Sequence, residues 1–292
     1  MQISAYVKQM NKAYPDLNIQ EAKRNDMGQN NDVLVINRSL VFRFPKYKKG
    51  IDRLHEETRI LEFLRGSVNL SIPEPAYRSF DKREPGKVFI GYPMIDGVPM
   101  YKESLDGLDN DLHLQVLSLQ LVNFLIGLHA VSEKKVKEIL PNATFHLKQA
   151  YTSMLERIQV KLFPYMRDDA QMEVTALFED FLAAIDDNQV KPALIHGDFG
   201  ASNILWDSNQ AKITGIIDFG GSGLGDPAYD LAGILASYGK VFFAKCIARY
   251  PEGEVLSKRA VFYQQTFALE EALHGIENDD QQALAAGLKN YT

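Results

Sequence analysis

The chain has 292 residues, 46% of them apolar, which is enough to bury one large core or the cores of two lobes. It has no run of 18 apolar residues, and its first residues lack the basic and apolar regions of a signal peptide, so we expect neither a membrane span nor a leader. The single cysteine, Cys246, excludes an internal disulfide and a cysteine metal cluster. It favours a cytoplasmic protein in which Cys246 is a small buried hydrophobe.

The net charge of −6 is unevenly distributed. Residues 1–95 carry 16 Lys and Arg against 11 Asp and Glu, a balance of +5, whereas residues 96–292 carry 16 against 27, a balance of −11. An acidic surface often serves solubility alone, but this asymmetry also suits a basic nucleotide-binding region beside an acidic region that attracts a cationic substrate. No basic stripe with interleaved aromatic residues occurs, so nucleic acid is not an expected partner.

The first 95 residues predict a β-rich region with one helix. Two short apolar strands, Val33–Ile36 and Leu40–Phe44, are joined by a turn at 37–39, and Val88–Met94 is a third strand. Ile51–Leu64 carries apolar residues at spacings of three and four, which predicts a helix that ends before the prolines of SIPEP.

From residue 96 onward the pattern is mainly helical. Helices are predicted over His113–Val131, Phe145–Phe163 and Met172–Ile185 and again from Tyr229, with a β-hairpin formed by Ile204–Trp206 and Ile213–Ile217 between them. A small β-rich lobe followed by a large helical lobe predicts an α+β molecule whose ligand site lies in the cleft between the lobes.

The polar residues that suit phosphoryl transfer lie between residues 194 and 230. Asn203 directly precedes the first hairpin strand and Asp218 follows the second, so the hairpin brings both to one end, where their oxygens can share Mg²⁺. Asp198, five residues before Asn203, stays free to accept a hydroxyl proton or to orient that hydroxyl. A positioned nucleophile and a metal that bridges the phosphates are the parts that phosphoryl transfer requires.

These residues resemble a known family. His196-Gly197-Asp198, Asn203, Asp218-Phe219-Gly220 and Gly225-Asp226-Pro227-x-x-Asp230 look like the motifs of the aminoglycoside phosphotransferase family, with Gly197 where protein kinases have arginine. The resemblance covers nearly the whole chain. It implies a bilobal protein-kinase-like fold, with a nucleotide-binding lobe at 1–95, a hinge at 92–95 and a helical lobe at 96–292 that holds the catalytic loop and the substrate site.

The resemblance also implies a role for each matching residue. Asp198 would be the catalytic base or hydroxyl-orienting group, and Asn203 and Asp218 would hold Mg²⁺. The remaining matches are predicted to be structural support: His196 braces the loop, Asp230 pins the loop from the following helix, and Asp226 caps that helix.

In the small lobe, Phe42-Arg43-Phe44-Pro45-Lys46 resembles the strand that carries the phosphate-contacting lysine of the family. Arg43 aligns with that lysine, as it does in related kinases that look as if they use arginine, and Lys46 is the alternative. Arginine stays cationic and can bind phosphate with two N–H groups, but it does not replace lysine atom for atom. Glu57 matches the helix glutamate that pairs with this cation, and Glu56 competes for that role.

The nucleotide is expected to meet two further segments. Gly28-Gln29-Asn30-Asn31-Asp32 stands in the place of the nucleotide loop, where small polar residues such as Asn30 and Asn31 can present backbone N–H groups to phosphates. Tyr92-Pro93-Met94-Ile95 resembles the hinge, where backbone groups of Tyr92 and of Met94 or Ile95 would bond the purine edge.

The acceptor is inferred from a finer likeness. FRFPKYKKGIDRLHEETRILEFL and IGYPMIDGVPM resemble the 2″-aminoglycoside branch, although that branch has histidine where this chain has Asn203. Aminoglycosides are polycations, which an acidic cleft would concentrate. Glu270, Glu271 and Glu277 lie where the branch contacts its drug, so they are candidate amine ligands, and exposed helix charge is the other interpretation.

Alternatives remain open at this point. A macrolide kinase, which would need an apolar cleft, and a metabolic sugar or amino-alcohol kinase are rival enzymes, and an inactive nucleotide-binding module is a rival of another class. A protein kinase is disfavoured because no Ala-Pro-Glu ends an activation segment after Asp218. We therefore expect a monomer that binds ATP or GTP, Mg²⁺ and a small cationic hydroxylated substrate.

Overall fold

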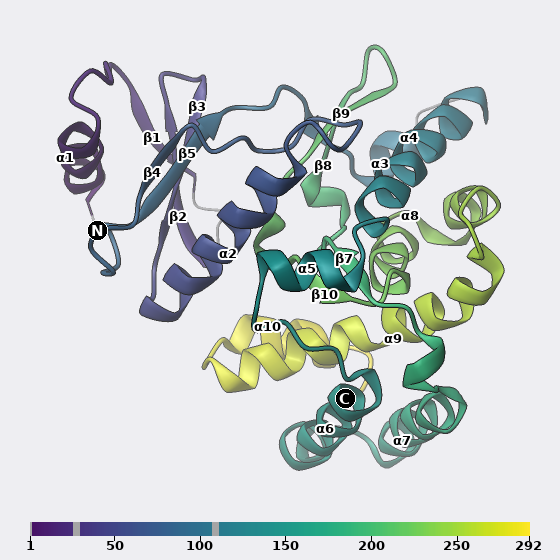
Figure 1. Cartoon of the computed structure of the whole chain (residues 1–292). Helices are drawn as coiled ribbons and strands as arrows, with labels where there is room; N and C mark the ends of the chain where they lie inside the picture. Colours follow the sequence, from purple (N-terminus) through teal and green to yellow (C-terminus); the bar gives the residue numbers. More distant parts are fainter. Residues whose placement is uncertain (1, 26–29, 107–110) are drawn as a thin grey trace.

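The computed structural model describes residues 2–25, 30–106 and 111–292, which form a small and a large lobe (Figure 1). The small lobe is built on a five-stranded antiparallel sheet with the order β1-β2-β3-β5-β4. Its strands are β1 (Ala22–Asn25), β2 (Asn31–Ile36), β3 (Leu40–Pro45), β4 (Tyr77–Ser79) and β5 (Phe89–Pro93). In the turn between β2 and β3, Asn37 and Arg38 have φ values of 51° and 55°. Two successive positive φ angles are typical of a type I′ turn, whose twist matches that of paired strands.

Both faces of this sheet are covered by a helix. α1 (Ile3–Ala13) packs on one face, where Tyr6 joins Phe42 and Phe44 of β3 in an apolar cluster. Because strand side chains alternate between faces, Arg43 points the other way, toward α2 (Lys48–Leu64). The helix α1 was not predicted from the sequence.

The helix α2 contributes to both lobes. Ile51 and Leu54 pack against the sheet, whereas Ile60 and Leu61 belong to the apolar core of the large lobe. Glu57 lies between these two groups and is only 3% exposed. The apolar pattern of α2 therefore fixes a carboxylate at the boundary of the lobes.

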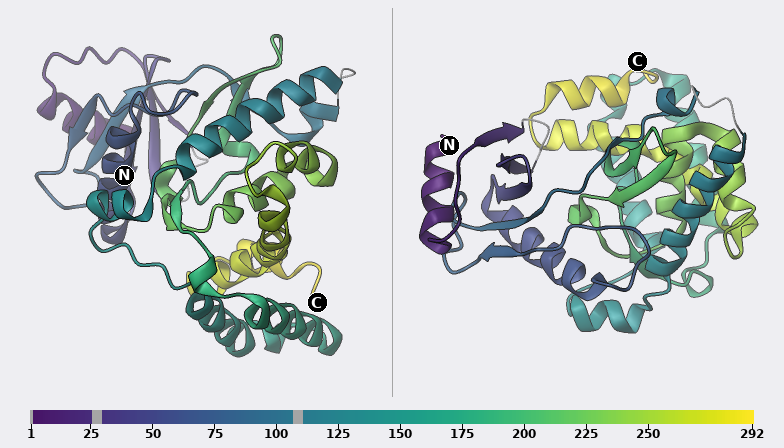
Figure 2. Two further views of the ribbon diagram at one scale, coloured as in Figure 1. Left: turned by 45° about the vertical axis from the view of Figure 1, so that its right-hand side comes forward. Right: turned by 90° about the horizontal axis from the view of Figure 1, so that it is seen from above.

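The large lobe is mainly helical. α4, α8 and α9 run through its core, and Figure 2 shows α6 and α7 at the end that lies far from the five-stranded sheet. Its helices are α3 (Lys102–Asp106), α4 (Asp111–His129), α5 (Glu133–Ile139), α6 (Leu147–Lys161), α7 (Asp168–Ala184), α8 (Ala228–Ile247), α9 (Gly253–Glu277) and α10 (Gln281–Leu288). This arrangement confirms the predicted α+β, kinase-like fold. The division at residue 95 remains a prediction.

Two small sheets carry the polar motifs of the large lobe. One has the order β6-β8-β9 and the other pairs β10 with β7, and their strands are β6 (Val98–Pro99), β7 (Ala193–Ile195), β8 (Ile204–Asp207), β9 (Lys212–Ile216) and β10 (Gly223–Gly225). Ile204 pairs with Ile216, so the residues just before β8 and just after β9 lie at the same end of the hairpin. This is the predicted placement of Asn203 and Asp218.

One described helix, α4, is long and apolar enough to cross a membrane by length and composition alone. Leu117, Leu121, Phe124 and Leu128 of α4 are fully buried inside the large lobe, whereas Leu112, Val116 and Leu119 are exposed. Only 39% of the apolar window of α4 is buried, so packing accounts for part of its hydropathy.

Candidate active site

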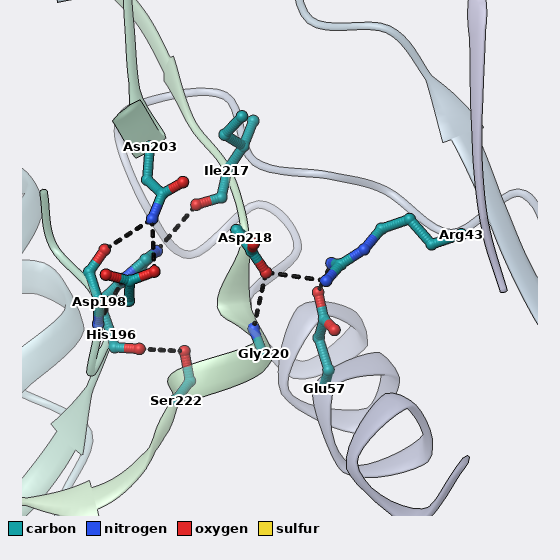
Figure 3. A network of polar contacts seen from close by, with 9 residues as sticks. All are labelled: Arg43, Glu57, His196, Asp198, Asn203, Ile217, Asp218, Gly220 and Ser222. Atoms are coloured by element: carbon teal, nitrogen blue, oxygen red, sulfur yellow. Dashed lines mark hydrogen bonds and ion pairs between the residues drawn. The ribbon is translucent and has the colours of Figure 1, made fainter. Parts of the chain in front are cut away.

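The catalytic loop, defined here as residues 196–203, begins where β7 ends (Figure 3). Gly197 has a φ of 78°, and a Cβ at this position would come within 2.2 Å of the Gly221 carbonyl oxygen, so the turn requires glycine. Asn203 Nδ2 donates to the carboxylate of Asp198 at 2.8 Å and to the Asp198 carbonyl at 2.9 Å. Asn203 therefore fixes both the side chain and the backbone of Asp198.

The surroundings of Asp198 raise the pKa of its carboxylate, which makes it a better proton acceptor. Partial desolvation raises the pKa of Asp198, and the nearby charge of Asp218 raises it further, whereas the Asn203 hydrogen bond acts in the opposite direction. A carboxylate whose pKa moves toward neutrality becomes a better general base.

His196 joins the catalytic loop to the strand that leads to Asp218. Its Nδ1 accepts the Asp198 backbone N–H at 3.2 Å, and its Nε2 lies 3.0 Å from the Ile217 carbonyl oxygen, to which it donates. The Ser222 hydroxyl donates to the His196 carbonyl at 2.9 Å. These contacts support the bracing role, which stays a prediction.

Asp218 adopts the left-handed conformation, with φ 62° and ψ 68°, and one carboxylate oxygen lies near the Gly220 N–H. That conformation is uncommon outside glycine but is tolerated by aspartate. The same oxygen accepts from Arg43 Nη2 at 2.8 Å. Burial alone would raise the pKa of Asp218, but Arg43 outweighs it and holds the pKa below its usual range. Asp218 is therefore ionised at neutral pH.

Arg43 bridges the two lobes. Its other terminal nitrogen pairs with the buried carboxylate of Glu57, so one guanidinium contacts both Glu57 and Asp218 (Figure 3). Burial alone would lower the pKa of Arg43, but the two carboxylates raise it, and the group stays cationic.

The two alternatives, Glu56 and Lys46, lie elsewhere. Glu56 is 44% exposed and lies beside Arg53 instead. Lys46 follows β3 and lines a separate hollow with Tyr6, so the geometry favours Arg43 and Glu57.

The helix α8 supports the catalytic loop along one face. Both oxygens of Asp230 accept backbone N–H groups, from His196 at 2.7 Å and from Gly197 at 2.8 Å. One turn later, Gly233 lies against the Phe199 carbonyl with no room for a Cβ, and Ser237 Oγ accepts from Ala201 N–H. Positions 230, 233 and 237 share a helix face. Of these three residues, only Asp230 was predicted from the sequence. The spacing, three residues from Asp230 to Gly233 and four more to Ser237, could have indicated that both face the same loop.

Asp226 has more partners than a helix cap requires. It accepts from the Ala228 N–H at the start of α8, from Nε and Nη2 along one edge of the Arg259 guanidinium and from the Tyr263 hydroxyl at 2.7 Å. It therefore also fastens α9 to the start of α8. Arg259 and Tyr263 were missed because they lie more than 30 residues away from Asp226 in the chain.

The predicted hinge contacts stay a prediction, but the hydrogen bonds of Met94 and Ile95 differ. The Met94 N–H already donates to the Ser39 carbonyl at 2.8 Å, so it is not free for a purine. Within the described residues the Ile95 N–H has no hydrogen-bond partner, which favours Ile95 over Met94 as the donor. The phenol of Tyr92 is buried, which raises its pKa to about 12.

The structure describes only part of the predicted nucleotide loop. Gly28 and Gln29 lie outside the described residues, while Asn30 is exposed and Asn31 begins β2.

The three glutamates of α9 that were predicted to bind amines have different surroundings. Glu270 accepts from the Tyr229 hydroxyl at 2.8 Å, its other oxygen lies 2.9 Å from Thr266 Oγ1, and burial raises its pKa. Glu271 is exposed. Glu277 pairs with Arg157 and Lys161 of α6, which neutralise it, so the structure argues against its predicted role as an amine ligand.

Comparisons with known proteins agree with this geometry. The profile of the phosphotransferase enzyme family matches residues 21–261. Viomycin phosphotransferase from Streptomyces vinaceus is 29% identical over 264 residues, which cover 88% of each protein. The GDP complex of wild-type aminoglycoside 2′-phosphotransferase-IIIa is 25% identical, with a TM-score of 0.90 over 99% of this chain and 97% of that chain. The GDP and kanamycin complex of APH(2″)-IIIa is 26% identical, with a TM-score of 0.88 over 97% and 96%. The chain therefore belongs to the phosphotransferase enzyme family and is a phosphotransferase of the aminoglycoside-kinase type.

Proposed function

We propose that this chain transfers the γ-phosphoryl group of GTP or ATP to a hydroxyl group of an aminoglycoside. The observation that carries the proposal is the fixed geometry of Asp198, which Asn203 holds at one end of the hairpin that also carries Asp218. In this role Asp198 accepts the proton of the acceptor hydroxyl, or orients that hydroxyl toward the phosphorus.

The residues present fit a magnesium ion. Asn203 donates through Nδ2 to Asp198, so its amide oxygen is turned away from the Asp198 carboxylate (Figure 3) and would face a metal at the hairpin end that also carries Asp218. No cluster of three His, Cys, Asp or Glu side chains suited to a metal occurs in the described part of the chain, and Mg²⁺ needs none, because it binds through one or two protein oxygens plus phosphates and water. Once bound, the metal neutralises phosphate charge.

The nucleotide is assigned to the small lobe and the hinge. Arg43 is the cation at the boundary of the lobes and presents a planar fork of N–H groups, which suits phosphate oxygens. The Ile95 N–H is the available hinge donor. GDP is bound in both of the solved relatives described above, which supports a guanine nucleotide as the phosphoryl donor.

A cationic acceptor is supported by the environment of Glu270. This carboxylate is largely buried and forms no ion pair with a described residue, whereas Glu277 is already paired. Tyr229, whose hydroxyl donates to Glu270, directly precedes Asp230, which accepts the backbone N–H groups of the catalytic loop, so Tyr229 connects Glu270 to the element that supports the loop. An unpaired buried carboxylate is stabilised by a cation, such as the ammonium group of an aminoglycoside.

Viomycin is the second candidate acceptor. The relative named viomycin phosphotransferase covers 88% of this chain, against 97% for the kanamycin complex, and its identity of 29% is similar to the 26% of that complex. Viomycin therefore belongs beside kanamycin in the first assay.

The test is a steady-state phosphoryl-transfer assay with GTP and ATP against kanamycin, gentamicin, viomycin and a macrolide. We expect transfer to at least one aminoglycoside, and Asp198→Asn should lower kcat by about 10²–10⁴-fold. Asp207→Asn, an aspartate in the turn of the same hairpin, is the matched control and should retain normal turnover. If only viomycin is phosphorylated, viomycin replaces the aminoglycoside as the acceptor. Unaltered turnover in Asp198→Asn would refute the role of Asp198 in the reaction.

A further inference from the structure

A buried polar chain reaches the catalytic loop from behind and involves two residues that have no role so far. His129 is the last residue of α4, and its side chain is 3% exposed. Its Nδ1 lies 2.7 Å from the Tyr250 hydroxyl, and its Nε2 lies 3.0 Å from the fully buried Asp230 Oδ2. The chain thus links α4, the segment between α8 and α9, and the carboxylate beneath the loop.

The chemistry of the end groups sets the direction of these hydrogen bonds. Burial would raise the pKa of Asp230, but its bonds with His129 and with backbone N–H groups lower it, so the carboxylate is ionised and can only accept. His129 Nε2 therefore carries a hydrogen. Burial raises the pKa of Tyr250, so that phenol keeps its proton, and its oxygen lies within hydrogen-bond distance of Nδ1 of the His129 ring.

The far end of the chain lies at the reacting residue. The Asp230 oxygen that faces His129 also accepts the His196 N–H, and its second oxygen accepts the Gly197 N–H. These two amides immediately precede Asp198. Gly197 has a positive φ and already touches the Gly221 carbonyl, so the loop has little room to adapt if Asp230 rotates. A rotation of Asp230 therefore displaces the carboxylate of Asp198.

We propose that His129 and Tyr250 are positioning residues: the Tyr250 hydroxyl orients the His129 ring, whose Nε2–H fixes the Asp230 carboxylate that sets the backbone before Asp198. The proposal rests on the proposed function in one respect, namely that Asp198 is the reacting carboxylate. Neither residue contacts the acceptor or the nucleotide in this scheme. Their loss should therefore affect kcat and leave KM unchanged for both substrates.

Two amide substitutions of His129 separate positioning from packing. The amide nitrogen of Gln reaches the position of Nε2, so His129→Gln can still donate to Asp230, whereas Asn reaches only as far as Nδ1. We expect His129→Asn to lower kcat about 10- to 100-fold, His129→Gln to stay within about threefold of the parent, and Tyr250→Phe to fall between them. His146→Asn, at an exposed histidine of the same lobe, is the control for the substitution itself.

Hydrogen exchange at the backbone amides of His196 and Gly197 gives a readout that does not require activity. Exchange should accelerate in His129→Asn and Tyr250→Phe and stay slow in His129→Gln. Equal kcat losses for Asn and Gln, or unchanged exchange at these two amides in His129→Asn, would overturn the positioning role. If the parent protein transfers phosphate to none of the acceptors, the proposed function fails, while the exchange data still decide whether His129 and Tyr250 hold the loop.

Discussion

The boundary between the lobes and the anchor beneath the catalytic loop both bury a carboxylate, but they satisfy it differently. At the boundary, one guanidinium serves two acids, Glu57 and Asp218. Beneath the loop, Asp230 receives two backbone N–H groups and an imidazole, and no Lys or Arg pairs with it among the described residues. The first region relies on opposite charges and the second on fixed dipoles.

This difference indicates which region can change during a reaction cycle. The side chain of Asp218 is 47% exposed, so another cation can replace Arg43 there while water and protein groups compensate. Asp230 is fully buried, and no solvent can replace a partner that it loses. The exposed, ion-paired region is suited to exchange partners, whereas the fully buried anchor is suited to hold geometry.

The largest expected effect is therefore at the anchor. Asp230→Ala leaves the His196 and Gly197 N–H groups and His129 without their acceptor, and each unsatisfied buried group costs about 1–3 kcal/mol, so we expect a loss of about 3–5 kcal/mol in the free energy of unfolding. Denaturant titration at neutral pH measures this loss. A change below about 1 kcal/mol would show that solvent reaches the anchor and would remove the contrast between the regions.

The same residue predicts a pH dependence. The pKa of Asp230 is lower in the folded protein than in the unfolded chain, so its contribution to stability is fully present above about pH 4 and is lost as pH falls through the folded-state value. The parent protein should thus lose more stability on acidification than Asp230→Asn does. Parallel pH profiles for the two proteins would contradict the lowered pKa.

Part of this contrast could be predicted from the sequence. Asn203 and Asp218 lie at the two ends of a short hairpin, so pairing rules alone bring them together, whereas Glu57 was assigned by its match to the helix glutamate of the family, with Glu56 as the competitor. The helix α1 was missed because the first residues were weighed only as a possible leader. Its tertiary support, the aromatic face of β3, comes from a strand some 30 residues later.

The unpredicted parts of the site depend on contacts that are distant along the chain. His129 and Asp230 are 101 residues apart, and His129 and Tyr250 are 121 residues apart. Nothing in the helix pattern of α4 distinguishes a histidine at its end from a solvated one. Glu270 and Glu277 likewise occupy one helix, and only the position of α6 makes the second an ion-pair partner.

A smaller effect is expected at the boundary, from Arg43→Lys. A lysine keeps the charge but cannot contact Glu57 and Asp218 with a planar fork, so we expect the KM for the nucleotide to rise about tenfold and the unfolding free energy to fall by about 1–2 kcal/mol. Lys46→Ala is the matched control and should leave the nucleotide KM unaltered. A larger effect from Lys46→Ala would move the phosphate contact to Lys46. A loss of stability from Arg43→Lys as large as that from Asp230→Ala would mean that the boundary holds geometry as firmly as the anchor does.

The smallest expected effect concerns a third way of holding a carboxylate, an ion pair at the surface. Arg157 and Lys161 lower the pKa of Glu277 to about 2, so its contribution is present above about pH 4.5, the ordinary value, and is lost as pH falls toward 2. Solvent screens this site, so Glu277→Gln should reduce stability by only about 0.2–1 kcal/mol at neutral pH and leave the acceptor KM unchanged. Glu270→Gln, on the same helix, should raise the acceptor KM, because the Glu270 carboxylate forms no ion pair with a described residue and is bonded to hydroxyl groups instead. If Glu277→Gln raised the acceptor KM as much as Glu270→Gln does, the ion pair with α6 would have to open for the substrate, and burial would no longer distinguish the two glutamates.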